Sequence, residues 1–161
     1  MIEEHAGAWT RTSRVVRGRP EELYAAFLDP TALVDWLPPA EMTGEIHEFD
    51  PQVGGGYRMS LFYPPDERAF RGKTSDKEDV VNVRFMELVR PRRIVEAVSF
   101  VTADPAFLGE MTLIATFEEV SGGTEVTLVF ENLPPGLRAK DNEAGSRLSM
   151  EQLARRFEST A

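Results

Sequence analysis

The chain has 161 residues, of which 42% are hydrophobic and 28% are charged, and no internal repeat is evident in it. A chain of this size and composition is expected to form one globular domain, spanning residues 1–161, with a full hydrophobic core. The formal net charge of −9 argues against nucleic acid as a partner, because phosphate-binding surfaces need clustered Lys and Arg.

Cysteine is absent, which excludes disulfides, thiol catalysis and thiolate metal sites. Residues 1–5 are polar and acidic, where an export signal would be basic and then apolar. No apolar run approaches the ~20 residues that are needed to span a bilayer. We therefore expect a cytoplasmic protein with no membrane association.

The first elements are predicted to be a strand and two short helices. Residues 9–17 alternate weakly in polarity and are predicted to form the strand. Pro20 is typical of a first helical turn and begins a helix in which Leu23 and Phe27 share a face. Asp29 and Pro30 repeat the start signal for a second helix, which carries Trp36.

From residue 43 the hydrophobic pattern changes to a period of two, which is typical of strands. Six strands are predicted, at residues 43–49, 57–63, 80–89, 94–101, 111–117 and 124–130. A charged segment, residues 64–78, interrupts this series. Because most links are short, the sheet is predicted to be antiparallel, with one face covered.

Residues 141–160 form the longest segment with a helical period. Ser146, Met150, Leu153 and Phe157 lie on one stripe of this predicted helix and must face the core. The stripe changes from small and polar to large and apolar along the chain. We therefore expect the second half of the helix to close one end of the core and the first half to leave a hollow.

Several short motifs together resemble a known family. They are Trp36-Leu37-Pro38, Gly54-Gly55-Gly56-Tyr57-Arg58, Gly72, Gly109-Glu110-Met111-Thr112 and Gly123-Thr124-Glu125-Val126-Thr127-Leu128. In this order the motifs resemble the SRPBCC superfamily of START-like domains, and within it bacterial relatives of the activator of heat-shock protein 90 ATPase, often labelled polyketide cyclase-like. The resemblance implies an α+β helix-grip fold, in which a curved antiparallel sheet of about seven strands wraps around a long C-terminal helix. Two short helices would lie between the first and second strands.

The resemblance also implies a cavity between the sheet and the helix, which holds an apolar ligand in many superfamily members. Many relatives carry a Gly-Trp pair where this chain has Gly145-Ser146. The space of the missing indole would be filled by neighbouring side chains, by water or by a ligand. Met86 is one of the side chains that could fill it. The predicted lining of the cavity is Trp36, Met42, Met59, Leu61, Phe85, Phe100, Phe107, Met111, Ser146, Ser149 and Met150.

No catalytic or metal-binding motif is evident, so no catalytic residue, metal or cofactor is predicted. His47 lies in a predicted strand beside Glu45 and could act as a base, although a solvent-exposed strand histidine is the expected interpretation. Glu96 and Glu110 lie in mainly apolar strands. Either would be a candidate acid or base if it faced inward, and alternation with Met111 places Glu110 outside.

The leading hypothesis is a noncatalytic domain that binds a small apolar or amphipathic molecule. The alternative is a cyclase- or hydrolase-like enzyme that uses the same cavity. A chaperone ATPase activator, implied only by the name of the family, is the lowest alternative. The edges of an antiparallel sheet could also pair into a homodimer, although no edge is conspicuously unprotected.

Overall fold

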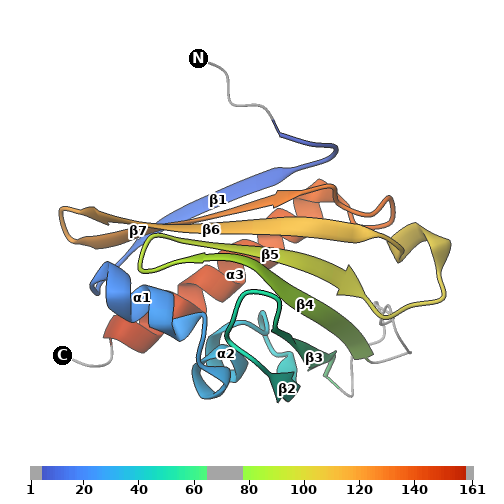
Figure 1. The fold of residues 1–161 in the computed structure, drawn as a ribbon, viewed down its shortest axis with the longest axis horizontal. Coiled ribbons are helices and arrows are strands. Elements are labelled where there is room, and N and C mark those ends of the chain that lie inside the picture. The colour runs from blue at the N-terminus through green and yellow to red at the C-terminus, as the bar shows by residue number, and fades with distance from the viewer. Residues whose placement is uncertain (1–4, 65–77, 159–161) are drawn as a thin grey trace.

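The computed structural model describes residues 5–64 and 78–158, and it confirms the predicted α+β helix-grip fold (Figure 1). The predicted order of elements is confirmed, and their ends differ from the prediction by no more than three residues. The charged segment between the strands lies mostly outside the described residues. In chain order the elements are β1 (Thr10–Val16), α1 (Pro20–Ala26), α2 (Pro30–Trp36), β2 (Thr43–Phe49), β3 (Gly56–Phe62), β4 (Glu78–Val89), β5 (Arg93–Phe100), the 3₁₀ turn η1 (Pro105–Phe107), β6 (Glu110–Val120), β7 (Gly123–Glu131) and α3 (Ala139–Glu158).

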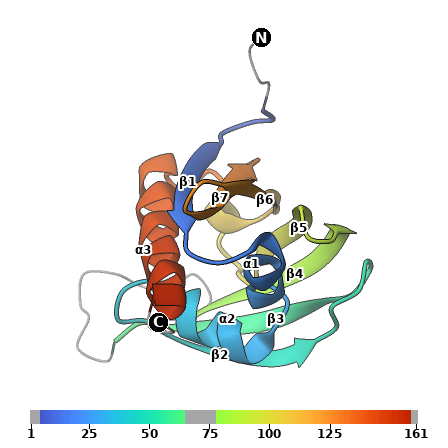
Figure 2. The same ribbon diagram turned by 90° about the vertical axis from the view of Figure 1, so that its left-hand side faces the viewer.

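The strands form one antiparallel sheet in the order β1-β7-β6-β5-β4-β3-β2. Figure 2 shows the sheet curving around α3, with α1 and α2 near the C-terminal end of that helix. None of the described helices combines the length and the apolar character that crossing a bilayer requires.

Alternation along the strands decides which side chains face α3. In β6, Met111, Leu113, Ala115 and Phe117 are all buried, whereas Glu110 is exposed and its carboxylate lies 3.6 Å from the guanidinium of Arg84. The prediction that Glu110 lies outside is confirmed. The buried set from each strand therefore faces inward and forms one wall of the core.

Both short helices begin as the prolines predict. The Asp29 side chain accepts a hydrogen bond of 3.0 Å from the backbone N–H of Thr31 and so caps α2. The indole N–H of Trp36 donates to the carbonyl of Ala26 at 3.0 Å, within the buried core. This bond ties α2 to α1 and fixes the plane of the Trp36 ring.

Helix α3 is fastened to the end of α2 by two polar side chains. The Ser149 hydroxyl donates to the carbonyl of Leu37 at 2.6 Å. The Gln152 amide donates to the carbonyls of Trp36 and Pro38 at 2.8 and 2.7 Å. These carbonyls lie at or just after the C-terminal end of α2, where backbone carbonyls have no partner within the helix. Helix α3 therefore completes the hydrogen bonding of that helix end.

Candidate ligand-binding cavity

A cavity of about 590 Å³ lies between the inner face of the sheet and the first half of α3. Its apolar wall comes from β3 to β7 and from α2, with the loop around η1 at one side. Most of the residues predicted to line it do so. They are Trp36, Met42, Leu61, Phe100, Phe107, Met111, Ser146 and Ser149.

The structure places three of the predicted residues in the solid core instead. Met59 lies on the inner face of β3, but its terminal methyl group is turned toward Gly44 of β2. Phe85 packs against the rings of Tyr57 and Phe49, at centroid distances of 6.0 and 6.2 Å. Met150 is 1% exposed and belongs to the packed half of α3. None of the three contributes to the surface of the cavity.

The expectation that Met86 could fill the cavity is wrong. Its side chain is 49% exposed and accepts a hydrogen bond of 3.3 Å from the Nε of Arg84. Phe85 occupies the inner face at this point, so the next residue, Met86, points outward. The pairing of β4 with β5 is irregular here, between Phe85 and Glu87.

The first half of α3 presents small residues to the cavity. A Cβ atom built on Gly145 would meet no atom within 4 Å apart from its chain neighbours and the nearby backbone of its own helix. Ser146 lies beside it on the cavity wall, whereas the hydroxyl of Ser149 is occupied by the carbonyl of Leu37. The space next to this part of the helix is therefore open, because no large side chain occupies it.

Among the residues that the structure describes, every titratable group on the cavity wall is an acid. These groups are Tyr57, Tyr63, Asp79, Glu96 and Asp141. Lys, Arg and His are absent from the described lining. The part of the wall that the described residues form is therefore negative or neutral.

Glu96 is the most unusual of these acids. It lies in β5 on the same face as Ile94 and Val98, and only 3% of its surface is exposed. Burial raises the pKa of its carboxyl group to about 8, because the charged form loses its hydration. At neutral pH this carboxyl group is mainly protonated and can donate a hydrogen bond.

Two phenols accompany the carboxyl groups. Burial raises the pKa of Tyr57 well above its ordinary value, and the nearby charge of Glu96 raises it further. Burial also raises the pKa of Tyr63, whose hydroxyl donates a 2.9 Å hydrogen bond to Asp79. The cavity thus has two polar regions, one around Glu96 and Tyr57 and one around Asp79 and Tyr63, within an otherwise apolar wall.

The sequence does not predict many of the other lining residues. It identifies Glu96 only as a conditional acid or base, and it does not identify Asp79, Tyr57 or Tyr63 as lining residues. Alternation places Tyr57 and Tyr63 on one face with Leu61, which is the signal that identifies them.

His47 lies outside this cavity. Its imidazole is exposed, with Nε2 2.7 Å from the Ser60 hydroxyl and Nδ1 4.0 Å from the Glu45 carboxylate. The expected interpretation, a solvent-exposed strand histidine that shares a face with Glu45, is confirmed.

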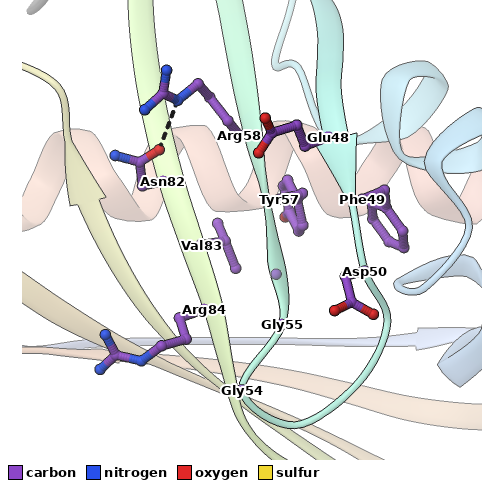
Figure 3. A pocket seen from close by; sticks show the side chains of 11 residues that line it. Glu48, Phe49, Asp50, Gly54, Gly55, Tyr57, Arg58, Asn82, Val83 and Arg84 are labelled. Carbon is purple, nitrogen blue, oxygen red and sulfur yellow. Dashed lines mark hydrogen bonds between the residues drawn. The ribbon is translucent and has the colours of Figure 1, made fainter.

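A second recess, of about 460 Å³, lies where the turn between β2 and β3 meets β4 (Figure 3). Its charged side chains are exposed, and the Nε of Arg58 donates to the half-buried Asn82 at 3.0 Å. Gly56 lets two strands approach closely, since a Cβ there would lie 1.8 Å from the carbonyl oxygen of Val83. Figure 3 shows α3 behind the sheet, so this recess is on the face away from the large cavity.

Metal binding has no geometric support in the described part of the chain. Residues 5–64 and 78–158 contain no group of three His, Asp or Glu side chains that could hold an ion.

The fold and the cavity define a helix-grip domain of the START-like type. Residues 17–158 match the family model described as Activator of Hsp90 ATPase homolog 1-like protein, and the chain belongs to this family. Comparison with curated proteins finds no match.

Solved structures show the same fold. A protein from Chromobacterium violaceum is 31% identical, with a TM-score of 0.83 over 93% of this chain and 96% of that one. A protein from Rhodobacter sphaeroides is 18% identical, with a TM-score of 0.77 over 100% of this chain and 99% of that one. An AHSA1-like protein from Aeromonas hydrophila is 16% identical, with a TM-score of 0.70 over 95% of this chain and 94% of that one. The last two likenesses concern the fold alone.

Proposed function

We propose that the protein binds a small apolar or amphipathic molecule in the cavity between α3 and the sheet. The observation that carries this proposal is the cavity itself, whose volume of about 590 Å³ lies within the usual range for small-molecule sites, roughly 300–1,000 Å³. Its wall is mainly apolar with a few converging polar groups, which is the usual composition of such sites.

Local packing supports the same proposal. An apolar space of this size costs stability unless something fills it, because its wall loses van der Waals contacts. The open space beside Gly145 is lined by a helix that could carry a larger side chain there. A ligand that binds in this space would restore the missing contacts.

The proposal is tested by blocking the cavity with an indole. Ser146→Trp places a large side chain on the cavity wall, whereas Leu148→Trp places the same ring on the exposed side of α3, where Leu148 is 39% exposed. Amide chemical shifts are recorded while 4-phenyl-1-butanol is added. We expect shifts around residues 145–149 in the wild type and in Leu148→Trp, and at least tenfold weaker binding in Ser146→Trp. Unchanged shifts in the wild type with this and other apolar probes would remove the proposal.

A second candidate function is acid–base catalysis in the same cavity, as in a cyclase or hydrolase. The observation that favours it is Glu96, whose pKa of about 8 lies near neutral pH, where a general acid or base works best. Hydrolysis of a 4-nitrophenyl ester of a short apolar acid is a direct test. Wild type and Glu96→Gln should differ at least tenfold in rate, and equal rates would exclude this use of Glu96.

A further inference from the structure

Glu96 is a buried carboxyl group for which residues 5–64 and 78–158 supply no partner. Its side chain is 3% exposed and lies on the wall of the cavity. The carboxyl group borders the cavity, and it makes no hydrogen bond or ion pair within the described part of the chain. Buried carboxyl groups in proteins are normally paired, so this one has an unused capacity to bind something in the cavity.

We propose that the ligand is an apolar molecule with a basic amine, and that the amine binds to the carboxyl group of Glu96. This inference rests on the proposed function, since it assumes that the cavity holds a ligand. It adds the chemical class of that ligand.

The charges on the wall favour an amine over an acid. Asp141 adds a further carboxyl group, and no described lining residue could neutralise a ligand carboxylate or phosphate. An anionic ligand would bring like charges together in a region of low dielectric, which is unfavourable. The net charge of −9 also draws cations toward the protein from solution.

An ammonium group would gain two kinds of contact that a neutral ligand lacks. The first is a charge-assisted hydrogen bond to Glu96, which is roughly twice as strong as a neutral one. The second is the attraction of a cation to aromatic faces, and the wall contains Trp36, Tyr57 and Phe130. A hydroxyl group of the same size would make only a neutral hydrogen bond.

Binding of the amine changes the protonation of Glu96. Burial raises the pKa of Glu96 to about 8, so the empty cavity holds the protonated acid at pH 7. When the ammonium group enters, the carboxyl group releases its proton to the solvent and remains as the carboxylate, paired with the cation. No other reactant is needed.

The experiment compares three probes that share one apolar body and differ in charge. They are 4-phenylbutylamine, 4-phenyl-1-butanol and 4-phenylbutyrate, titrated at pH 7 by calorimetry or by amide shifts. We expect the amine to bind at least fivefold more tightly than the alcohol and at least tenfold more tightly than the carboxylate. Glu96→Gln should remove the advantage of the amine over the alcohol, and Glu96→Met, which also removes the carboxyl group, should do the same.

Glu110→Gln is the matched control, because Glu110 has the same charge but lies on the exposed face of β6. This variant should keep the order of the three probes. If the three probes bind equally well to the wild type, or if the amine keeps its advantage in both Glu96 variants, the inference is wrong while the proposed function stands. If none of the three binds, both are overturned.

Discussion

The raised pKa of Glu96 predicts a large dependence of stability on pH. The carboxyl group has an ordinary pKa of 4.5 in the unfolded chain and a pKa of about 8 in the folded one. The folded state therefore holds on to a proton that the unfolded state releases between these values, and folding becomes less favourable as the pH rises through this window. Each pH unit costs about 1.4 kcal/mol, so the free energy of unfolding loses roughly 3 kcal/mol by pH 7 and roughly 5 kcal/mol by pH 8.

Glu96→Gln removes this dependence, because an amide of similar size carries no proton equilibrium. The free energy of unfolding of the variant should exceed that of the wild type by little near pH 4.5 and by roughly 5 kcal/mol near pH 8, because the wild type loses this amount through the same linkage. The free energy of unfolding is measured by urea denaturation at pH values from 4.5 to 8.5.

The control for this measurement is Glu110→Gln, whose carboxylate is exposed, so its stability should follow the wild type at every pH. A constant difference between Glu96→Gln and the wild type over this range would refute the reasoning. It would mean that the carboxyl group is hydrated inside the cavity and keeps an ordinary pKa.

Three further substitutions test how α3 is held and why its first half is open. Gly145→Ala should stabilise the protein by about 1 kcal/mol in thermal or urea unfolding, because the new methyl group meets no atom and alanine favours the helix. Ser149→Ala should destabilise it by about 1–2 kcal/mol in the same assay, since the carbonyl of Leu37 loses its donor. Gln152→Ala should cost about 2 kcal/mol, because two carbonyls at the end of α2 lose their donor, and a loss below 0.5 kcal/mol would show that water replaces it.

The architecture was predictable because local patterns agree with the global fold. The prolines at the starts of α1 and α2, the period of two in the strands and the helical stripe of α3 each depend on nearby residues only. Short links between strands leave few alternatives to an antiparallel sheet. The helix stripe also predicted a hollow at Ser146, because residue size changes along the stripe.

The orientation of Glu96 was harder to predict. Both faces of β5 are largely apolar in sequence, with Ile94 and Val98 on one side and Val95 and Ala97 on the other. Alternation within this strand therefore does not identify the inner face. The register with its neighbours does, since Glu96 is paired with the buried residues Phe85 and Leu113. That pairing is a tertiary property.

The errors at Met59 and Phe85 have the same origin. Both side chains lie on the inner face, as alternation predicts, and both are fully buried. Whether an inward side chain borders a cavity or fills the core depends on its rotamer and on the size of its neighbours, as the ring contacts of Phe85 with Tyr57 and Phe49 illustrate. A hydrophobic pattern contains neither kind of information.

Three features that cost stability meet in one place. A glycine lies in the first half of α3 where alanine would fit, a buried carboxyl group has no partner among the described residues, and an apolar space is left between helix and sheet. Each could be removed by one or two substitutions that the surrounding backbone would accept, as Gly145→Ala and Glu96→Gln illustrate. Features that weaken a fold and converge on one site are more readily explained by a requirement for binding than by independent defects, because function is the usual reason that such costs are retained. This argument connects the open first half of α3 to Glu96 on the facing sheet, and it requires that Gly145→Ala and Glu96→Gln raise stability while at least one of them weakens ligand binding.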